Sequence, residues 1–166
     1  MATKTMNDLL ITFMQGVYYA ERQILKALPK LAKASENQEL KSALLHHREE
    51  TQGQVDRLQK AFEALGKRAR GQTCEAINGL IEEGDEIVEA FEAGPVRDAG
   101  IVACAQAVEH YEMARYGTII AWAKAVGAED VARLMHDTLE EEKKADSTLN
   151  QLAQKRLNQE AVRPAA

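Results

Sequence analysis

The helical pattern of this chain is clearest over residues 10–31, which read LITFMQGVYYAERQILKALPKL. Apolar residues recur there every three or four positions, and this spacing places them on one face of a helix. They are Leu10, Met14, Val17, Ile24, Leu28 and Leu31. Glu21 falls on the same face, where a carboxylate is costly unless it is paired, protonated or bound to a metal.

Three other segments repeat this arrangement of an apolar face interrupted by acids. The acids are Glu50 in residues 44–65, Glu109 and Glu112 in residues 101–123, and Glu142 in residues 131–152. One acid on such a face has an ion pair as its ordinary explanation. An acid on each of four helices indicates a ligand that all four helices share.

Length and charge restrict the classes of protein to which the chain can belong. Its 166 residues suit one domain with a core of its own, and no apolar run is long enough to span a membrane. Residues 1–8 lack a secretory signal pattern, so we expect a cytoplasmic protein. The net charge of −5 argues against nucleic-acid binding. Cys74 and Cys104 have no metal-binding spacing and are predicted to be free thiols.

The composition predicts an all-α protein. Strong helix formers dominate, and we expect four long helices at about residues 5–34, 38–65, 96–126 and 129–157. A shorter helix, at about 74–93, falls in the long crossover between the second and third long helices. This connection is that of a ferritin-like four-helix bundle rather than of an up-down-up-down bundle. Residues 1–157 are predicted to form the bundle, and 158–166 a disordered tail.

Local signals refine these boundaries. Pro29 lies inside the first helix and is expected to kink or break it. Gly79 and Gly84 weaken the short helix, which Thr73 is placed to cap. Either Ser35 or Asn37 is available to cap the second long helix.

The acids form a candidate di-metal site. Di-iron and di-manganese bundles take carboxylates from all four helices, usually with two Glu-x-x-His motifs. The chain departs from this form, because His47 precedes Glu50 and a second acid, Glu112, follows Glu109. The candidate ligands are Glu21, Glu50, Glu109, Glu112 and Glu142, with His47 and Asp146 as further candidates. Gln54, Tyr111 and Tyr116 are predicted to lie behind them and orient them.

Each candidate also has a structural explanation. Glu21 could pair with Arg22 or with a lysine of another helix. Glu50 and Glu142 each stand beside another acid and could belong to a solvated acidic face. His47 could be a hydrogen-bonded core histidine, and the tyrosines could be half-buried packing residues.

The sequence resembles the YciE/YciF family of ferritin-like proteins. The matching segments, which follow one another along nearly the whole chain, are residues 19–21 (YAE), 28–31 (LPKL), 47–51 (HREET), 79–84 (GLIEEG), 108–112 (VEHYE) and 138–143 (TLEEEK). Of these segments, 47–51 and 108–112 are the specific ones. The resemblance implies a ferritin-like fold, a homodimer, a bacterial stress response and a di-metal site of the ferroxidase type.

Two functions follow from these observations. In the first, two iron ions, or manganese in their place, lie among the acids, and the protein oxidises ferrous iron or consumes peroxide. In the second, the protein is a non-catalytic structural or interaction protein of the stress response with a vestigial metal site. The metal hypothesis predicts that Glu21, Glu50, Glu112 and Glu142 converge in the middle of the bundle. Apolar residues off the main face, Leu25, Leu45 and Ile120, favour a dimer.

Overall fold

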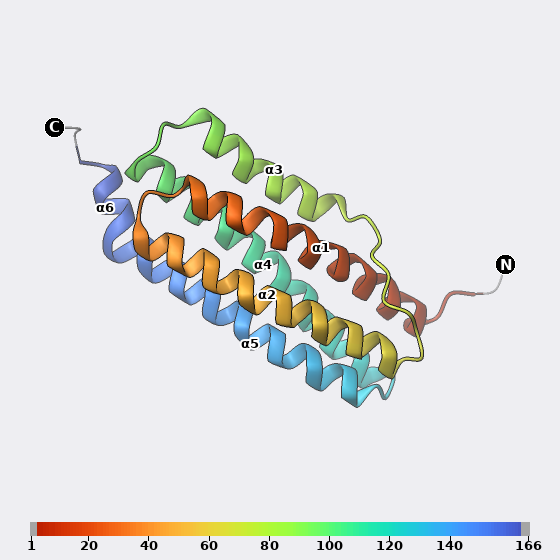
Figure 1. Cartoon of the computed structure of the whole chain (residues 1–166). Coiled ribbons are helices and arrows are strands. Elements are labelled where there is room, and N and C mark those ends of the chain that lie inside the picture. Colours follow the sequence, from red (N-terminus) through yellow and green to blue (C-terminus); the bar gives the residue numbers. More distant parts are fainter. Residues whose placement is uncertain (1–2, 164–166) are drawn as a thin grey trace.

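A computed structural model describes residues 3–163, and within this range the chain is all-α, as predicted. The main helices are α1 (Met6–Ala34), α2 (Gln38–Ala64), α3 (Glu75–Ala90), α4 (Pro95–Ala125) and α5 (Glu129–Leu152) (Figure 1). A π-helical turn, η1 (Ala153–Leu157), and the short α6 (Asn158–Ala161) follow α5 without a break.

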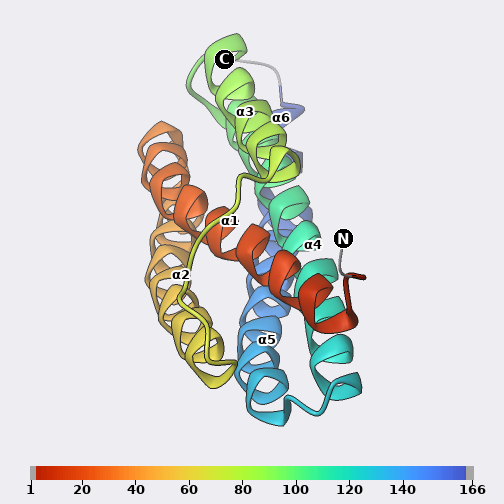
Figure 2. The ribbon, with the colours of Figure 1, turned by 90° about the vertical axis from the view of Figure 1, so that its right-hand side faces the viewer.

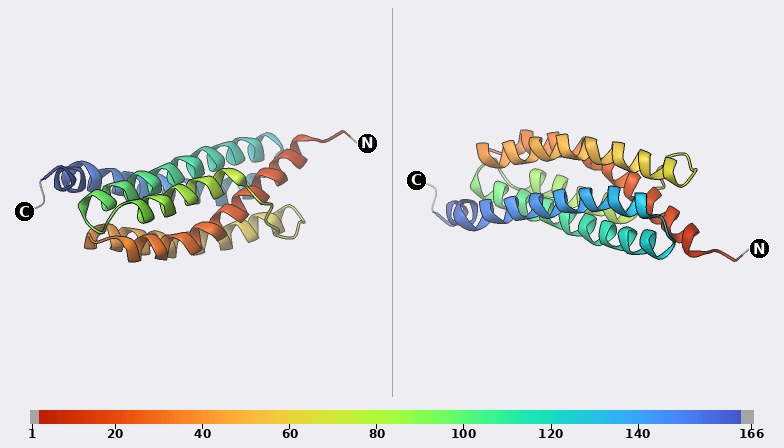
Figure 3. Two further views of the ribbon diagram at one scale, coloured as in Figure 1. Left: turned by 90° about the horizontal axis from the view of Figure 1, so that it is seen from above. Right: turned by 90° about the horizontal axis from the view of Figure 1, so that it is seen from below.

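The four long helices lie side by side. Helix α1 packs on α2 and α4, and α5 packs on the same two helices from the other side. Helices α2 and α4 run in one direction, and α1 and α5 in the other (Figure 1). Helix α3 lies outside this group, against α1 and α4, and is on the opposite side of the molecule from α5 (Figure 3).

The connection between α2 and α3 crosses α1, as Figure 2 shows in yellow. The backbone N–H of Gln72 donates to the carbonyl oxygen of Gln15 at 3.0 Å. Gly71 lies so close to α1 that a Cβ there would be 3.3 Å from that of Tyr19. A residue larger than glycine would have to displace the loop or the helix. The crossover therefore has a defined path over α1.

The structure decides several local predictions about helix breaks and caps. Helix α1 continues through Pro29, and α3 continues through Gly79 and Gly84, so neither helix is broken. Thr73 does not cap α3, because Cys74 is its N-cap residue and makes no capping hydrogen bond. Asn37 caps α2 and accepts from the backbone N–H groups of Glu39 and Leu40.

The chain also stays helical beyond residue 157. The buried Leu157 and an ion pair of 2.9 Å between Arg156 and Glu39 hold this end of the chain on the bundle. Of the predicted tail, residues 158–161 are thus helical, and residues 164–166 lie outside the described residues.

The apolar core consists of two clusters. One contains Leu10, Met14, Phe62, Tyr116 and Met135, and the other contains Ile24, Leu44, Ile101, Leu149 and Leu157, each with further residues from the same helices. All four long helices contribute to both clusters. Ile120 belongs to the first cluster, so its predicted exposure is wrong, whereas Leu45 is exposed as expected.

Candidate metal centre

A layer of buried polar side chains separates the two apolar clusters. It lies at the point where each long helix passes from one cluster to the other. The buried members are Glu21 on α1, His47, Thr51 and Gln54 on α2, Glu109 and Glu112 on α4, and Thr138 and Glu142 on α5. The 3-4 spacing of each helix faces these residues inward, because they continue the apolar stripe on either side.

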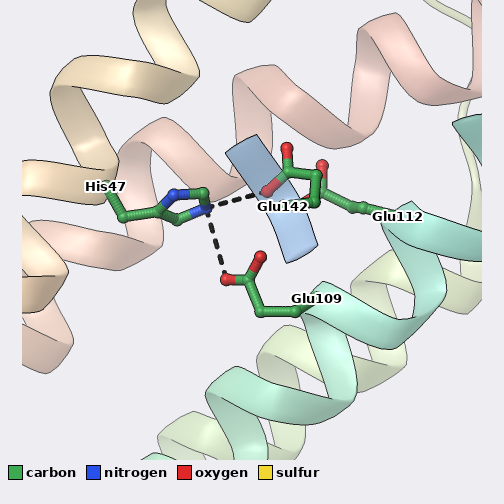
Figure 4. Close-up of side chains that lie close together, drawn as sticks. All are labelled: His47, Glu109, Glu112 and Glu142. Atoms are coloured by element: carbon green, nitrogen blue, oxygen red, sulfur yellow. Dashed lines mark ion pairs between the residues drawn. The ribbon is translucent and has the colours of Figure 1, made fainter. Parts of the chain in front are cut away.

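Four of these side chains converge on one point. One ligand atom from each of His47, Glu109, Glu112 and Glu142 lies within 4.8 Å of the corresponding atoms of the other three (Figure 4). The Nε2 atom of His47 is 3.2 Å from Oε1 of Glu109 and 3.4 Å from Oε2 of Glu142. This arrangement of one imidazole and three carboxylates can hold a divalent cation.

The same side chains have atoms without a hydrogen-bond partner. Both carboxylate oxygens of Glu112 and of Glu142 are buried and unpartnered, as is one oxygen each of Glu21 and Glu109. The ion-pair distances of His47 Nε2 are short, but their angles are not those of hydrogen bonds, so this nitrogen is unpartnered too. Buried polar atoms are rarely left unpaired. A cation in the layer would satisfy them together, so the residues present fit a metal.

Burial gives the acids of this layer unusual protonation behaviour. It raises the pKa of Glu21 to about 7, although a hydrogen bond from the hydroxyl of Tyr116 to Oε1 of Glu21 acts in the opposite direction. Burial, reinforced by the neighbouring carboxylates, also raises the pKa values of Glu112 and Glu142 well above the ordinary range. The pKa of Glu109 is raised by burial, against the attraction of His47. Without a cation, the layer therefore retains protons near neutral pH.

His47 is oriented by a residue at the edge of the layer. Its Nδ1 atom is 3.3 Å from Oε2 of Glu50, which leaves Nε2 facing Glu109 and Glu142. Burial lowers the pKa of His47, but Glu50 and the other carboxylates outweigh it and the net pKa is raised. The Glu50 side chain is 18% exposed, and its other oxygen is 3.2 Å from Nε2 of His46. Glu50 thus lies between the surface and the buried layer, beside rather than within the group of four.

The structure places the remaining predicted residues in different positions. Asp146 is at the rim, where its Oδ1 lies 3.1 Å from the amide nitrogen of Gln106 and 3.2 Å from His110 Nε2. Tyr116 contacts a candidate ligand directly, because its hydroxyl donates to Oε1 of Glu21. The hydroxyl of Tyr111 instead lies 3.1 Å from Sγ of Cys74, where α4 meets the start of α3.

Gln54 belongs to a hydrogen-bond network between α2 and α5 that was not predicted from the sequence. Its amide donates to Oε2 of Glu141 at 3.0 Å, and the guanidinium of Arg57 binds both oxygens of the same carboxylate. Arg57 also donates to the hydroxyl of Thr138 at 3.0 Å. This network joins α2 to α5 one turn from the acids. The available signal was an arginine and a glutamate next to buried stripe positions on two different helices.

Two narrow clefts reach the layer and both end at Glu109. The first, of about 50 Å³, opens between α2 and α5, and its walls mix apolar residues with His46, Glu50 and Lys144. The second, of about 30 Å³, lies among α1, α3 and α4 and is lined almost entirely by apolar residues such as Leu28, Ile81 and Val108. The first cleft offers polar groups that can contact a cation, whereas the apolar walls of the second suit an uncharged molecule.

Comparisons with known proteins place the chain in a family. The family model described as "Domain of unknown function (DUF892)" matches residues 5–162. The chain belongs to the DUF892 family. Protein YciF of Escherichia coli (strain K12) is 42% identical over 162 residues, which are 97% of this chain and 98% of YciF. The resemblance to the YciE/YciF group is thereby confirmed.

Solved structures of similar chains agree with this assignment. The crystal structure of the E. coli stress protein YciF matches with a TM-score of 0.90, over 94% of this chain and 99% of that one. YcfI of Rhodopseudomonas palustris is 50% identical and matches with a TM-score of 0.87 over 89% and 94% of the two chains. A Xanthomonas campestris protein, 22% identical with a TM-score of 0.72 over 91% and 92%, shares the fold. Among residues 3–163, no helix is long and apolar enough to cross a membrane.

Proposed function

We propose that this DUF892 protein is a ferritin-like di-metal carboxylate protein of a bacterial stress response. In this proposal it works in the cytoplasm, binds two iron ions and either oxidises ferrous iron or consumes peroxide. The observation that carries the proposal is the set of buried, unpartnered ligand atoms on His47, Glu109, Glu112 and Glu142. The description of YciF as a stress protein supports its cellular setting.

The charge of the layer favours two divalent ions over one. Glu21, Glu109, Glu112 and Glu142 carry four negative charges when ionised, which two divalent cations neutralise. Carboxylate oxygens with one imidazole are donors that suit iron and manganese. Glu21 extends the group of four, because it is fully buried in the same layer and, after burial, its charge is the largest cause of the raised pKa of Glu112.

The residues of the chain would have distinct roles in this function. An iron pair supplies electrons for the reduction of oxygen or peroxide when it is bound. Glu50 fixes the ring of His47, so that Nε2 is presented to the layer. Tyr116 fixes one oxygen of Glu21 and leaves the other free. The cleft between α2 and α5 provides a path for cations, with Glu50 on its wall and Glu109 at its inner end.

A second function, a non-catalytic structural role, also has support. YcfI, which is 50% identical, carries a description as a proposed structural protein. The raised pKa values of the buried glutamates show how the layer could exist without metal, as protonated carboxyl groups. The two functions therefore differ in what neutralises the acids.

Metal content distinguishes them. Protein expressed in iron-replete cells and purified without chelators should contain about two iron ions per chain, the number expected of a two-metal site. The Glu112→Gln and Glu142→Gln variants should lose most of this metal, because each removes a buried ligand. Glu140→Gln, which changes an exposed acid of α5, should retain it. Elemental analysis showing almost no metal in the wild type, with no uptake on anaerobic reconstitution, would establish the structural role.

We also propose that the protein is a homodimer. Leu45 on α2 is 44% exposed, and Met6 and Leu9 near the start of α1 are 45% and 40% exposed. Apolar side chains that stay exposed often mark contacts between proteins. Light scattering at micromolar concentration should give twice the chain mass of 18.4 kDa. A mass of one chain would contradict this proposal and leave the metal proposal unaffected.

A further inference from the structure

A broad cleft with basic walls lies between α1 and the crossover that joins α2 to α3. Its volume is about 800 Å³. One wall is a face of α1, from Gln15 to Lys26, and the other is the crossover between α2 and α3 at residues 68–71. The two walls are joined by the close approach of Gly71 to Tyr19.

Four cations line this cleft and no acid does. They are Arg22 and Lys26 on α1 and Arg68 and Arg70 on the crossover. Among the described residues, none of the four has an ion-pair partner. The chain as a whole has a net charge of −5. Four unpaired cations gathered at one hollow of an acidic protein create a local positive potential, and a cleft concentrates such a field.

The walls of the cleft are held in place by hydrogen bonds. The crossover is fixed to α1 by the bond from Gln72 to the Gln15 carbonyl. The Tyr19 hydroxyl donates to the side-chain oxygen of Asn78 at 2.9 Å, and the Tyr18 hydroxyl accepts from the amide of Gln59 at 3.2 Å. A ligand would therefore meet a concave surface that is already formed, which reduces the entropic cost of binding.

We propose that this cleft binds a compact anion with several negative charges, of the oligophosphate class. Three arginines and one lysine suit phosphate oxygens, because guanidinium groups bind them with paired, charge-assisted hydrogen bonds. The extent of the positive surface favours a small ligand over a nucleic-acid strand. Beyond Lys26, the next hollow has the acids Glu82 and Asp85 opposite Lys26 and Lys30, so its charges balance and the positive surface ends there.

The test uses inorganic triphosphate as the probe and calorimetry as the readout. The full-length protein should bind triphosphate at an ionic strength of about 0.05 M, and more weakly at about 0.15 M, because salt screens the charges. The double variant Arg68→Gln/Arg70→Gln should bind at least about tenfold more weakly, since it removes two charge-assisted contacts. The control, Arg48→Gln/Lys124→Gln, removes the same charge from exposed positions outside the cleft and should bind within about twofold of the wild type.

Three results would overturn the proposal. One is the absence of triphosphate binding by the wild type up to about 1 mM, the weakest affinity of interest. Another is equal weakening in the two double variants, which would indicate nonspecific charge attraction. The third is tighter binding of a single-stranded oligonucleotide than of triphosphate, which would indicate a nucleic-acid surface. A second cleft variant, Arg22→Gln, should also weaken binding. Melting curves of all variants confirm that they are folded.

Discussion

Ferrous or manganous ion in excess should raise the melting temperature of the metal-free protein by about 5–10 °C at pH 7.5. The physical reason is that cations bind the folded layer, in which His47, Glu109, Glu112 and Glu142 converge, and not the unfolded chain. At 100 times the dissociation constant, binding to one site contributes about 2.7 kcal/mol. Circular dichroism under anaerobic conditions measures the shift.

Matched variants show whether the shift comes from the layer. Glu142→Gln should abolish it, because Glu142 is fully buried and neither of its oxygens has a hydrogen-bond partner. Glu140→Gln changes a neighbour on α5 whose side chain is 52% exposed, and should leave the shift intact. A wild type whose melting temperature is indifferent to both metals would contradict the di-metal proposal.

The metal-free protein should become less stable as the pH rises from about 5.5 to 7.5, with a loss of roughly 5–10 °C in melting temperature. Glu21, with a folded-state pKa of about 7 against an ordinary value of 4.5, holds its proton more firmly when folded. The stability that this proton confers, roughly 3 kcal/mol, is complete below pH 4.5 and is lost as the pH passes the folded pKa. The raised pKa values of Glu109, Glu112, Glu142 and His47 act in the same direction.

Glu50 does not change this expectation. The hydrogen bond with His47 lowers the pKa of Glu50, so its contribution is lost only as the pH falls through that lowered value, below the measured window.

The Glu21→Gln variant isolates this effect in the residue whose folded-state pKa, about 7, lies inside the measured window. Glutamine resembles the protonated acid but cannot ionise, so the metal-free variant should be more stable than the wild type at pH 7.5, by about 1–3 kcal/mol, and similar at pH 5.5. Glu63→Gln, which replaces an exposed acid of α2, should keep the pH dependence of the wild type. Urea denaturation at the two pH values provides the measurement. A wild type that gains stability toward pH 7.5, or a Glu21→Gln variant that is destabilised at both values, would show that the acids act as ionised structural partners.

The buried acids could be predicted from the sequence because helical periodicity fixes which residues share a face. Glu21, Glu112 and Glu142 occupy apolar stripe positions and are fully buried. The all-α class and all five main helices followed from the same pattern, with helix ends correct to within about five residues. Whether the acids bind metal stays a prediction.

Other features depend on how the helices pack, and a single helix pattern does not contain that information. Glu50 and Asp146 lie at the rim because the approach of α2, α4 and α5 leaves these positions near the surface. Ile120 lies off the stripe of α4 but is buried in the first apolar cluster. The ion pair of Arg57 with Glu141 joins residues 84 positions apart, so each helix can mark its own residue as a neighbour of buried positions but cannot predict the pairing.

The division of the core into two apolar clusters bears on how this family can change over time. The two clusters are formed by separate stretches of each long helix, and the polar layer occupies only the one or two turns of each helix between them. Substitutions within that turn alter the ligands without removing the contacts that hold either cluster together. Descendants of one ancestral bundle could therefore exchange, reduce or lose their metal chemistry while the architecture persists, so two close relatives need not share an activity.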